Sequence, residues 1–162
     1  MTAQPTTAAR APRSVTMFTP LAKLLLKAGV PLGPNGLITI RGRKSGLPRT
    51  TPVAIIEVEG RRWVWAPWGE VNWVRNLRAA GRATLTVRGR ELEVSATELD
   101  EAQRVAYFRD VLGPLAGSIP FGRAFIRIVD GVDISRPTEV AKGRRVFELT
   151  PIESSQRTDR AA

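Results

Sequence analysis

Residues 37–66 read LITIRGRKSGLPRTTPVAIIEVEGRRWVWA, and this stretch decides the expected fold. Runs rich in β-branched or aromatic residues alternate in it with turn residues: the runs are 37–40, 50–58 and 61–66, and the turns are 42–46 and 59–60. Such runs between glycine-containing turns are typical of strands joined by hairpins. The stretch therefore predicts three consecutive strands, the first two joined by a basic turn.

The residues that follow predict further strands with a few helices between them. Asn72 is the expected N-cap of a short helix through Ala80 that ends at Gly81. Asp100 is expected to cap a second helix, which ends at Gly113. The other expected elements are a hairpin of residues 83–87 and 91–97, a helix or strand at 121–129, a helical turn at 138–142 and a closing strand at 145–149.

Strands joined mostly by hairpins indicate a mainly β fold, an antiparallel barrel with peripheral helices rather than a βαβ sheet. The chain has 162 residues, which predicts one domain, at 14–152. Residues 1–13 are expected to form a disordered tail and residues 153–162 a flexible one. Residues 16–28 have apolar side chains at helical spacing, which predicts an amphipathic helix that packs on the domain or contacts a membrane.

The charge and composition limit the possible functions. Lys and Arg total 25 against 15 Asp and Glu, a net charge of +10, and residues 1–56 contain no acid. This charge attracts polyanions, whether nucleic acid, anionic lipid or a small ligand with phosphate and carboxylate groups. The chain has no Cys and no His, so disulfides and the usual zinc, haem and Ser-His sites are excluded, and no metal is expected. We therefore expect an organic cofactor to supply the chemistry.

The basic turn and the residues after it, RGRKSGLPRTTP at 41–52, are the most informative segment for function. Its glycines free the backbone, so that amide groups and Ser45 can turn toward an anion. Arg43 and Arg49 can hold anionic oxygens bidentately, and Lys44 adds a mobile positive charge. The segment predicts a phosphate-binding turn, with a solvated hairpin turn as the alternative.

An ordered set of residues resembles the signature of the deazaflavin-dependent nitroreductase family. The set is Gly42-Arg43-Lys44-Ser45-Gly46, Arg49, Thr51-Pro52, Ala66, Gly69 and Trp73-Val74-Arg75-Asn76-Leu77. The resemblance implies a split β-barrel of the flavin-reductase or pyridoxamine-oxidase-like kind. It also implies reduced coenzyme F-420, an 8-hydroxy-5-deazaflavin, as hydride donor, and a quinone, enone or nitroaromatic as the electron-poor substrate.

The same resemblance implies roles for single residues. Those expected at the anionic tail of the cofactor are Arg43, Lys44, Ser45 and Arg49. Those expected around its ring are Thr51 and Pro52, the backbone of Ala66, Pro67 and Trp68, and the side chains of Trp73 and Asn76. Trp68 replaces a smaller residue of the family pattern, so it is also expected in the substrate pocket. Tyr107, the only tyrosine, is the candidate for a catalytic hydroxyl.

The position expected for Trp63 and Trp65 differs from that expected for Trp68. They share one face of a strand by two-residue spacing, which favours the core or the barrel wall. Trp68 lies between Pro67 and Gly69, in a loop, and is the better candidate for a pocket.

Two alternative functions stay open at this point. One is a split-barrel oxidoreductase that binds FMN, which is less favoured than F-420, and the other is a small basic nucleic-acid-binding barrel. No nucleic-acid partner is expected, because the cations form a compact turn rather than a long stripe. No apolar run is long enough to span a membrane and no secretory signal is seen. A cytoplasmic protein is expected, with peripheral contact at the inner face of the cell membrane through residues 16–28 as an option. The oligomeric state is left open.

Overall fold

The computed structural model describes residues 35–152, so the helix expected at 16–28 and the two tails lie outside the described residues. The strands are β1 (Gly36–Arg41), β2 (Pro48–Val53), β3 (Ile55–Val58), β4 (Arg61–Ala66), β5 (Arg82–Val87), β6 (Arg90–Glu98) and β7 (Arg145–Pro151). The helical elements are α2 (Asn72–Ala80), α3 (Glu101–Ala106), the π-helical η2 (Tyr107–Leu112), α4 (Gly113–Ser118), α5 (Gly122–Val129) and α6 (Pro137–Gly143). No helix in this part of the chain is long and apolar enough to cross a membrane.

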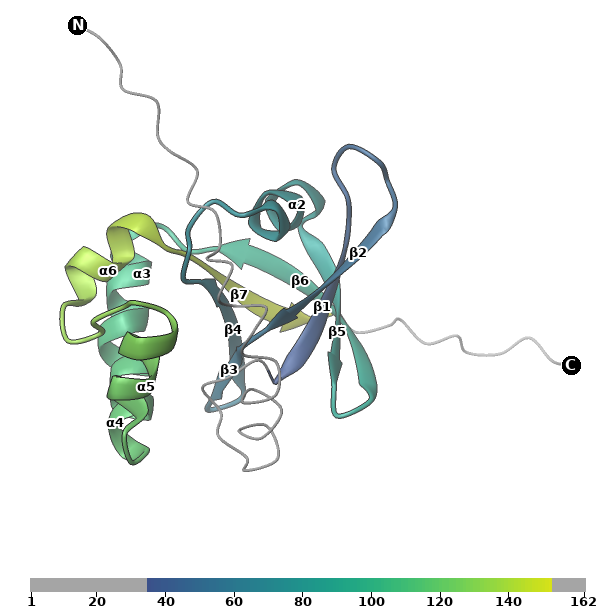
Figure 1. The fold of residues 1–162 in the computed structure, drawn as a ribbon. Coiled ribbons are helices and arrows are strands. Elements are labelled where there is room, and N and C mark those ends of the chain that lie inside the picture. Colours follow the sequence, from purple (N-terminus) through teal and green to yellow (C-terminus); the bar gives the residue numbers. More distant parts are fainter. Residues whose placement is uncertain (1–34, 153–162) are drawn as a thin grey trace, which may run out of the picture.

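The strands form one antiparallel sheet that curls into a barrel. Its order is β2-β1-β5-β6-β7-β4-β3, which puts β2 and β3 at opposite edges. These two strands are nevertheless consecutive in the chain and separated by Ala54 alone. A sheet whose two edges are joined by one residue has to curl until the edges meet, and Figure 1 shows the curled sheet with α2 over one end. The expectation of a mainly β, split antiparallel barrel with peripheral helices is confirmed.

The run at 50–58 is one strand in the sequence prediction and two strands in the structure. β2 pairs with β1, whereas β3 pairs with β4, so the chain changes partner at Ala54. The side chain of Asn35 stabilises this break. Its Nδ2 donates to the Ile55 carbonyl and its Oδ1 accepts from the Ile55 amide, both at 2.8 Å. Backbone groups that lose a ladder partner at the break are thereby satisfied.

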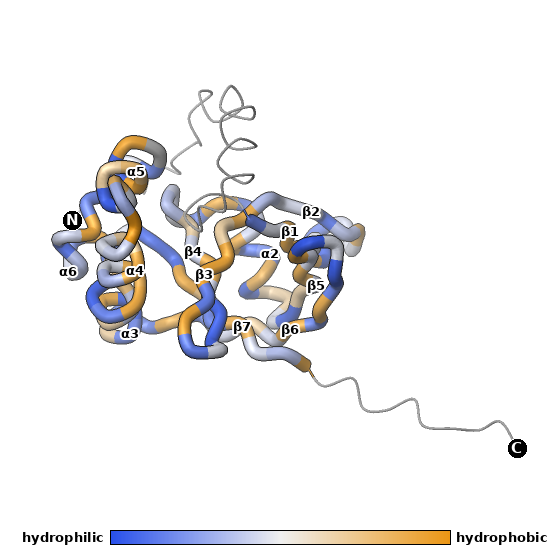
Figure 2. Tube along the Cα trace, turned by 90° about the horizontal axis from the view of Figure 1, so that it is seen from below, coloured by the Kyte–Doolittle hydropathy of each residue, from blue (hydrophilic) through white to orange (hydrophobic). Residues whose placement is uncertain are grey.

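Alternating side chains divide the interior into two hydrophobic clusters. On β4, Val64 and Ala66 face the barrel interior, where Val74 and Leu77 of α2 also pack. Trp63 and Trp65 point to the other face, against the helices, and contact Tyr107 and Phe108. Both tryptophans are buried, which confirms their expected place in the core. Figure 2 shows hydrophobic segments in both the barrel and the helical layer beside it.

Helix boundaries follow the predictions only in part. Asp100 caps α3 through a reciprocal pair of hydrogen bonds with Gln103, as a capping box does. Gly113 does not end this helix, because the backbone widens into η2 and continues as α4. Asn72 is the first residue of α2 rather than its cap, which is Val71 and makes no side-chain hydrogen bond. The segment at 121–129 is helical.

Candidate functional site

A polar cleft of about 720 Å³ lies between the β1–β2 turn and α2. Figure 1 shows this turn projecting beside α2 at one end of the barrel. The described residues that line the cleft are Ile40, Gly42, Arg43, Lys44, Ser45, Pro48, Arg49, Thr50, Thr51, Asn72, Trp73 and Asn76. Its size is within the range of sites for small ligands and cofactors.

The shape of the basic turn depends on its two glycines. Gly42 donates to the Leu47 carbonyl and accepts from the Gly46 amide, both at 2.8 Å, which closes the turn. A Cβ at position 42 would lie 2.9 Å from Ser45 Oγ and 3.2 Å from the Leu47 carbonyl oxygen, so a side chain there would force Ser45 to move and would crowd the turn. Gly46 has a φ of 68°, a left-handed conformation that glycine adopts without strain. The side chains of Arg43, Lys44 and Arg49 are thereby presented at the surface, where all three residues are exposed.

Asn76 attaches this turn to α2. Its Oδ1 accepts from the Arg43 guanidinium at 2.9 Å and from the Arg43 backbone amide at 3.3 Å. Asn76 is only 8% exposed, although its neighbours on the turn are open to solvent. A buried amide that accepts from a cation makes a strong, oriented bond. The Asn76 side chain thus holds both the backbone amide and the guanidinium of Arg43.

The cleft is positively charged because Arg43, Lys44 and Arg49 line it and none of its described lining residues is acidic. The closest acid in sequence to α2, Glu70, is engaged by other cations. Its carboxylate pairs with Arg78 at 2.7 Å and with Arg145 at 2.8 Å. These bonds, first that from Arg78, lower the pKa of Glu70 to about 2. Arg78 also pairs with Glu98, so this arginine serves a structural ion-pair network rather than the field of the cleft.

The structure brings together most of the residues predicted at the site. Thr51 lines the cleft with the basic turn, as do Trp73 and Asn76 from α2. Pro52 does not line it, and lies exposed on β2 opposite Leu37. The role of Asn76 as a partner of Arg43 is absent from the sequence prediction. The family resemblance singles out Asn76 for a place near the ring, but nothing in the sequence pairs it with Arg43, which lies 33 residues away.

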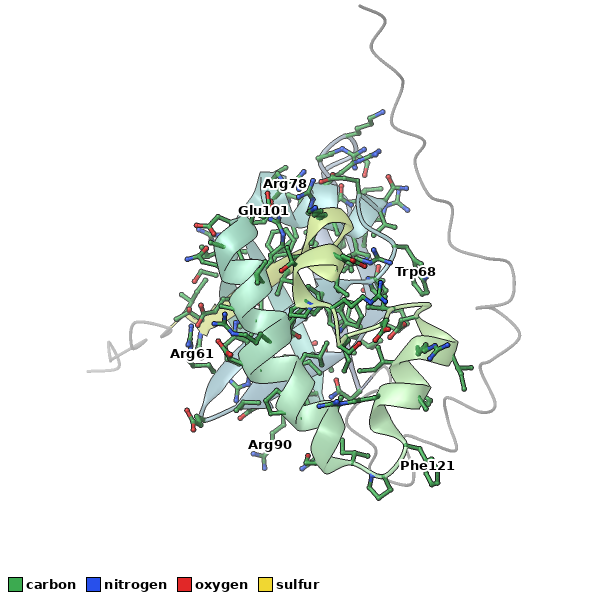
Figure 3. All side chains as sticks on the ribbon, turned by 90° about the vertical axis from the view of Figure 1, so that its left-hand side faces the viewer. Arg61, Trp68, Arg78, Arg90, Glu101 and Phe121 are labelled. Carbon is green, nitrogen blue, oxygen red and sulfur yellow. The ribbon has the colours of Figure 1, made fainter. Side chains whose placement is uncertain are left out.

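The loop after β4, which carries the predicted ring contacts, lies outside the cleft lining. Ala66 is fully buried and its carbonyl accepts from the Gly69 amide. The Pro67 carbonyl accepts from the Arg144 guanidinium at 3.1 Å. Trp68 is half-buried, and Figure 3 shows it at the edge of the helix-covered face. The loop is therefore held in place by the segment that leads into β7.

Tyr107 is not brought to the cleft. It is 3% exposed, belongs to the cluster between sheet and helices, and packs against Trp63 and Phe108. Its hydroxyl has no hydrogen-bond partner among the described residues, and burial raises the pKa of this phenol above its usual range. A hydroxyl enclosed in this way does not reach a ligand in the cleft.

Comparison with known proteins gives one family and a set of similar folds. Residues 26–117, more than half of the chain, match the family described as F420H(2)-dependent quinone reductase. No curated protein matches the sequence. A structure described as a domain-swapped dimer is similar with a TM-score of 0.50 and 19% identity, over 85% of this chain and 99% of that chain. An F420-H2 dependent reductase has a TM-score of 0.50 and 21% identity, over 72% of this chain and 94% of that chain. At these identities the two structures are alike in fold.

Proposed function

The chain belongs to the F420H(2)-dependent quinone reductase family, and from this premise we propose that it transfers a hydride from reduced coenzyme F-420 to a quinone. Membership makes it an oxidoreductase with a deazaflavin reductant. The quinone as substrate, with enones and nitroaromatics as related electron acceptors, and the residues at the site belong to the proposal. The observation that carries it is the cleft between the basic turn and α2, which has cations and no acid among its described lining residues.

The residues of the cleft suit a cofactor with an anionic tail and a flat ring. Arg43, Lys44 and Arg49 supply three positive charges on one side. Trp73, half-buried and packed on Phe147 at 6.3 Å between ring centroids, supplies an apolar wall on α2. A groove of this kind combines electrostatic attraction for the tail with burial of an aromatic surface. When bound, the reduced deazaflavin supplies the hydride.

The protein's own residues bind and orient. Arg43 and Arg49 hold tail oxygens through charge-assisted hydrogen bonds, and Lys44 adds charge without fixed geometry. Ser45 and the turn amides add neutral donors. Thr51 lines the cleft from β2, beyond the turn, and we assign it to contact with the ring. Fixing two reactants in one orientation is itself a large part of catalysis in such an enzyme.

We place the substrate beside the loop after β4. This loop leads directly into α2, whose residues Asn72 and Trp73 line the cleft. Ala66 and Pro67 form a rigid base, and Trp68 offers a partly exposed indole on which a flat quinone can stack. Pro52 lies on the edge strand β2 outside the lining of the cleft, so we assign it no direct contact.

Three titrations and one turnover assay test the proposal. Oxidised F-420, FMN and a single-stranded oligonucleotide are titrated separately, with the tryptophan or ligand fluorescence as readout, at low and high salt. We expect tight binding of F-420, weaker binding of FMN, and oligonucleotide binding that disappears with salt. Oxidation of the reduced cofactor is then followed with a soluble quinone. Preference for FMN would refute the cofactor assignment, and binding of F-420 without quinone reduction would refute the substrate class alone.

A further inference from the structure

Helix α5 and Phe121, the residue before it, expose two large apolar side chains. Phe121 is 87% exposed and Ile128 is 79% exposed, the largest fractions among the exposed apolar side chains of the described residues. Figure 3 shows Phe121 at the outer end of the helical layer, pointing away from the protein. Isolated exposed apolar residues are common on protein surfaces, so a binding role for these two depends on the backbone and the charges around them.

The backbone at Phe121 supports a functional reason. Phe121 has a φ of 60°, in the left-handed region that residues with a Cβ avoid. Its carbonyl still accepts from the Phe125 amide at 2.8 Å, so the strained residue starts α5. Strained backbone that displays an unpaired apolar group is more typical of binding surfaces than of the fold's own packing.

Arginines flank the apolar strip. In α5 the side chains of Ala124 and Ile128 lie on the exposed side, with Arg123 and Arg127 next to them, while Ile126 points into the core. The two arginines line a hollow of about 470 Å³ with Ala124, Ile128, Asp133 and Ile134. Neither arginine forms an ion pair with a residue of the described part of the chain, although the carboxyl group of Asp133 belongs to the same hollow. α5 itself contains no acid.

We propose that α5, together with Phe121 before it, docks on an anionic lipid bilayer, with Phe121 and Ile128 entering the interface and Arg123 and Arg127 contacting lipid phosphates. Apolar residues beside arginines on one helix face match the interfacial region of such a membrane. A second copy of the chain is a poorer fit, because a two-fold contact through this strip would bring the same arginines of both copies together. Figure 1 places α5 on the far side of the barrel from the basic turn, so docking leaves the cleft accessible.

The surface is tested without any enzyme assay, so that failure here is separate from failure of the proposed reduction. The chain has no Cys, so the full-length variant F121C can be labelled at one position with an environment-sensitive dye. Vesicles of phosphatidylglycerol with phosphatidylcholine should shift the emission to the blue, and phosphatidylcholine alone should do so far less. The same dye on I152C, directly after β7 where the side chain is also exposed, should stay in water.

A matched pair of double variants measures the contribution of the strip. F121S/I128S should weaken partitioning to anionic vesicles by roughly tenfold to a hundredfold, since two buried apolar side chains are lost. L37S/I152S removes two exposed apolar side chains of the barrel and should change partitioning by less than about twofold. Equal partitioning of F121S/I128S and the original chain would overturn the proposal, as would sedimentation that leaves the dye at position 121 in water.

Two further outcomes would identify another occupant and also overturn the proposal. A blue shift without vesicles that grows with protein concentration would show that a second copy covers the strip. A blue shift without vesicles at every concentration would show that the chain's own remaining residues cover it.

Discussion

The hydrogen bonds between Arg43 and Asn76 lead to a prediction that distinguishes two possible roles of Asn76. It either positions Arg43 or contacts the cofactor directly. Replacing Asn76 by Ala removes the oxygen that accepts from the Arg43 guanidinium at 2.9 Å and from its amide at 3.3 Å. A net hydrogen bond to a charged group contributes about 1.5–3 kcal/mol, and the longer amide bond adds less. Because the turn around it is exposed, we expect a value around the lower end of this range, about 1–2 kcal/mol, or roughly a 5- to 30-fold weaker affinity for F-420.

A double-mutant cycle is the assay. F-420 is titrated by fluorescence into N76A, R43A and the double variant, with thermal unfolding as a check on the fold. If Asn76 acts through Arg43, the double variant should bind about as weakly as R43A alone, which gives a coupling energy of about 1–2 kcal/mol. N72A is the matched control, since Asn72 is an exposed asparagine on the same helix and also lines the cleft. Its coupling to Arg43 should be close to zero.

The additive result would refute this reasoning. If the two losses in N76A and R43A simply add in the double variant, Asn76 contacts the cofactor by itself and does not act through the turn. N76D gives an independent check, because it keeps an acceptor oxygen at the same place while it adds a negative charge. We expect N76D to keep the turn resistant to proteolysis and still to weaken F-420 binding, more strongly at low salt than at high salt.

Three further predictions concern other parts of the site. R49A should weaken F-420 binding by roughly 1.5–3 kcal/mol in a fluorescence titration, and unchanged affinity with the fold intact would remove Arg49 from the site. W68S should leave F-420 affinity nearly unchanged and alter the relative kcat/KM for quinones, enones and nitroaromatics, whereas loss of cofactor binding with unchanged ratios would place Trp68 in the cofactor wall. The pKa of Glu70 is lowered from 4.5 to about 2, so its ion pairs stabilise the fold above pH 4.5, and this stability is lost as the pH falls toward 2. After discounting for a side chain that is one third exposed, the loss is about 1 kcal/mol, and unfolding of E70Q should depend less on pH in this window.

The sequence alone determined the features that depend on neighbours a few residues away. Alternation placed Trp63 and Trp65 on one buried face of a strand, as β4 confirms. The carboxylate of Asp100 reaches the amide of Gln103, only three residues ahead, so the start of α3 is readable from the chain. The two glycines and the cations between them define the basic turn without help from the rest of the fold. These local energies are the same in any fold that contains the segment, which is why the sequence predicts them.

Only the tertiary structure decided which distant segments meet. The uniform β-branched run at 50–58 gives no sign that the chain changes partner at Ala54, because the break depends on two different neighbouring strands and on Asn35. The pairing of Arg43 with Asn76 joins residues 33 positions apart, and the contact of Arg144 with Pro67 joins residues 77 positions apart. Tyr107 faces the core rather than the cleft because the helical layer packs on the outer side of the sheet. Such contacts form only after the barrel has closed. Their geometry depends on how the whole sheet curls, so it cannot be predicted from any short stretch of sequence.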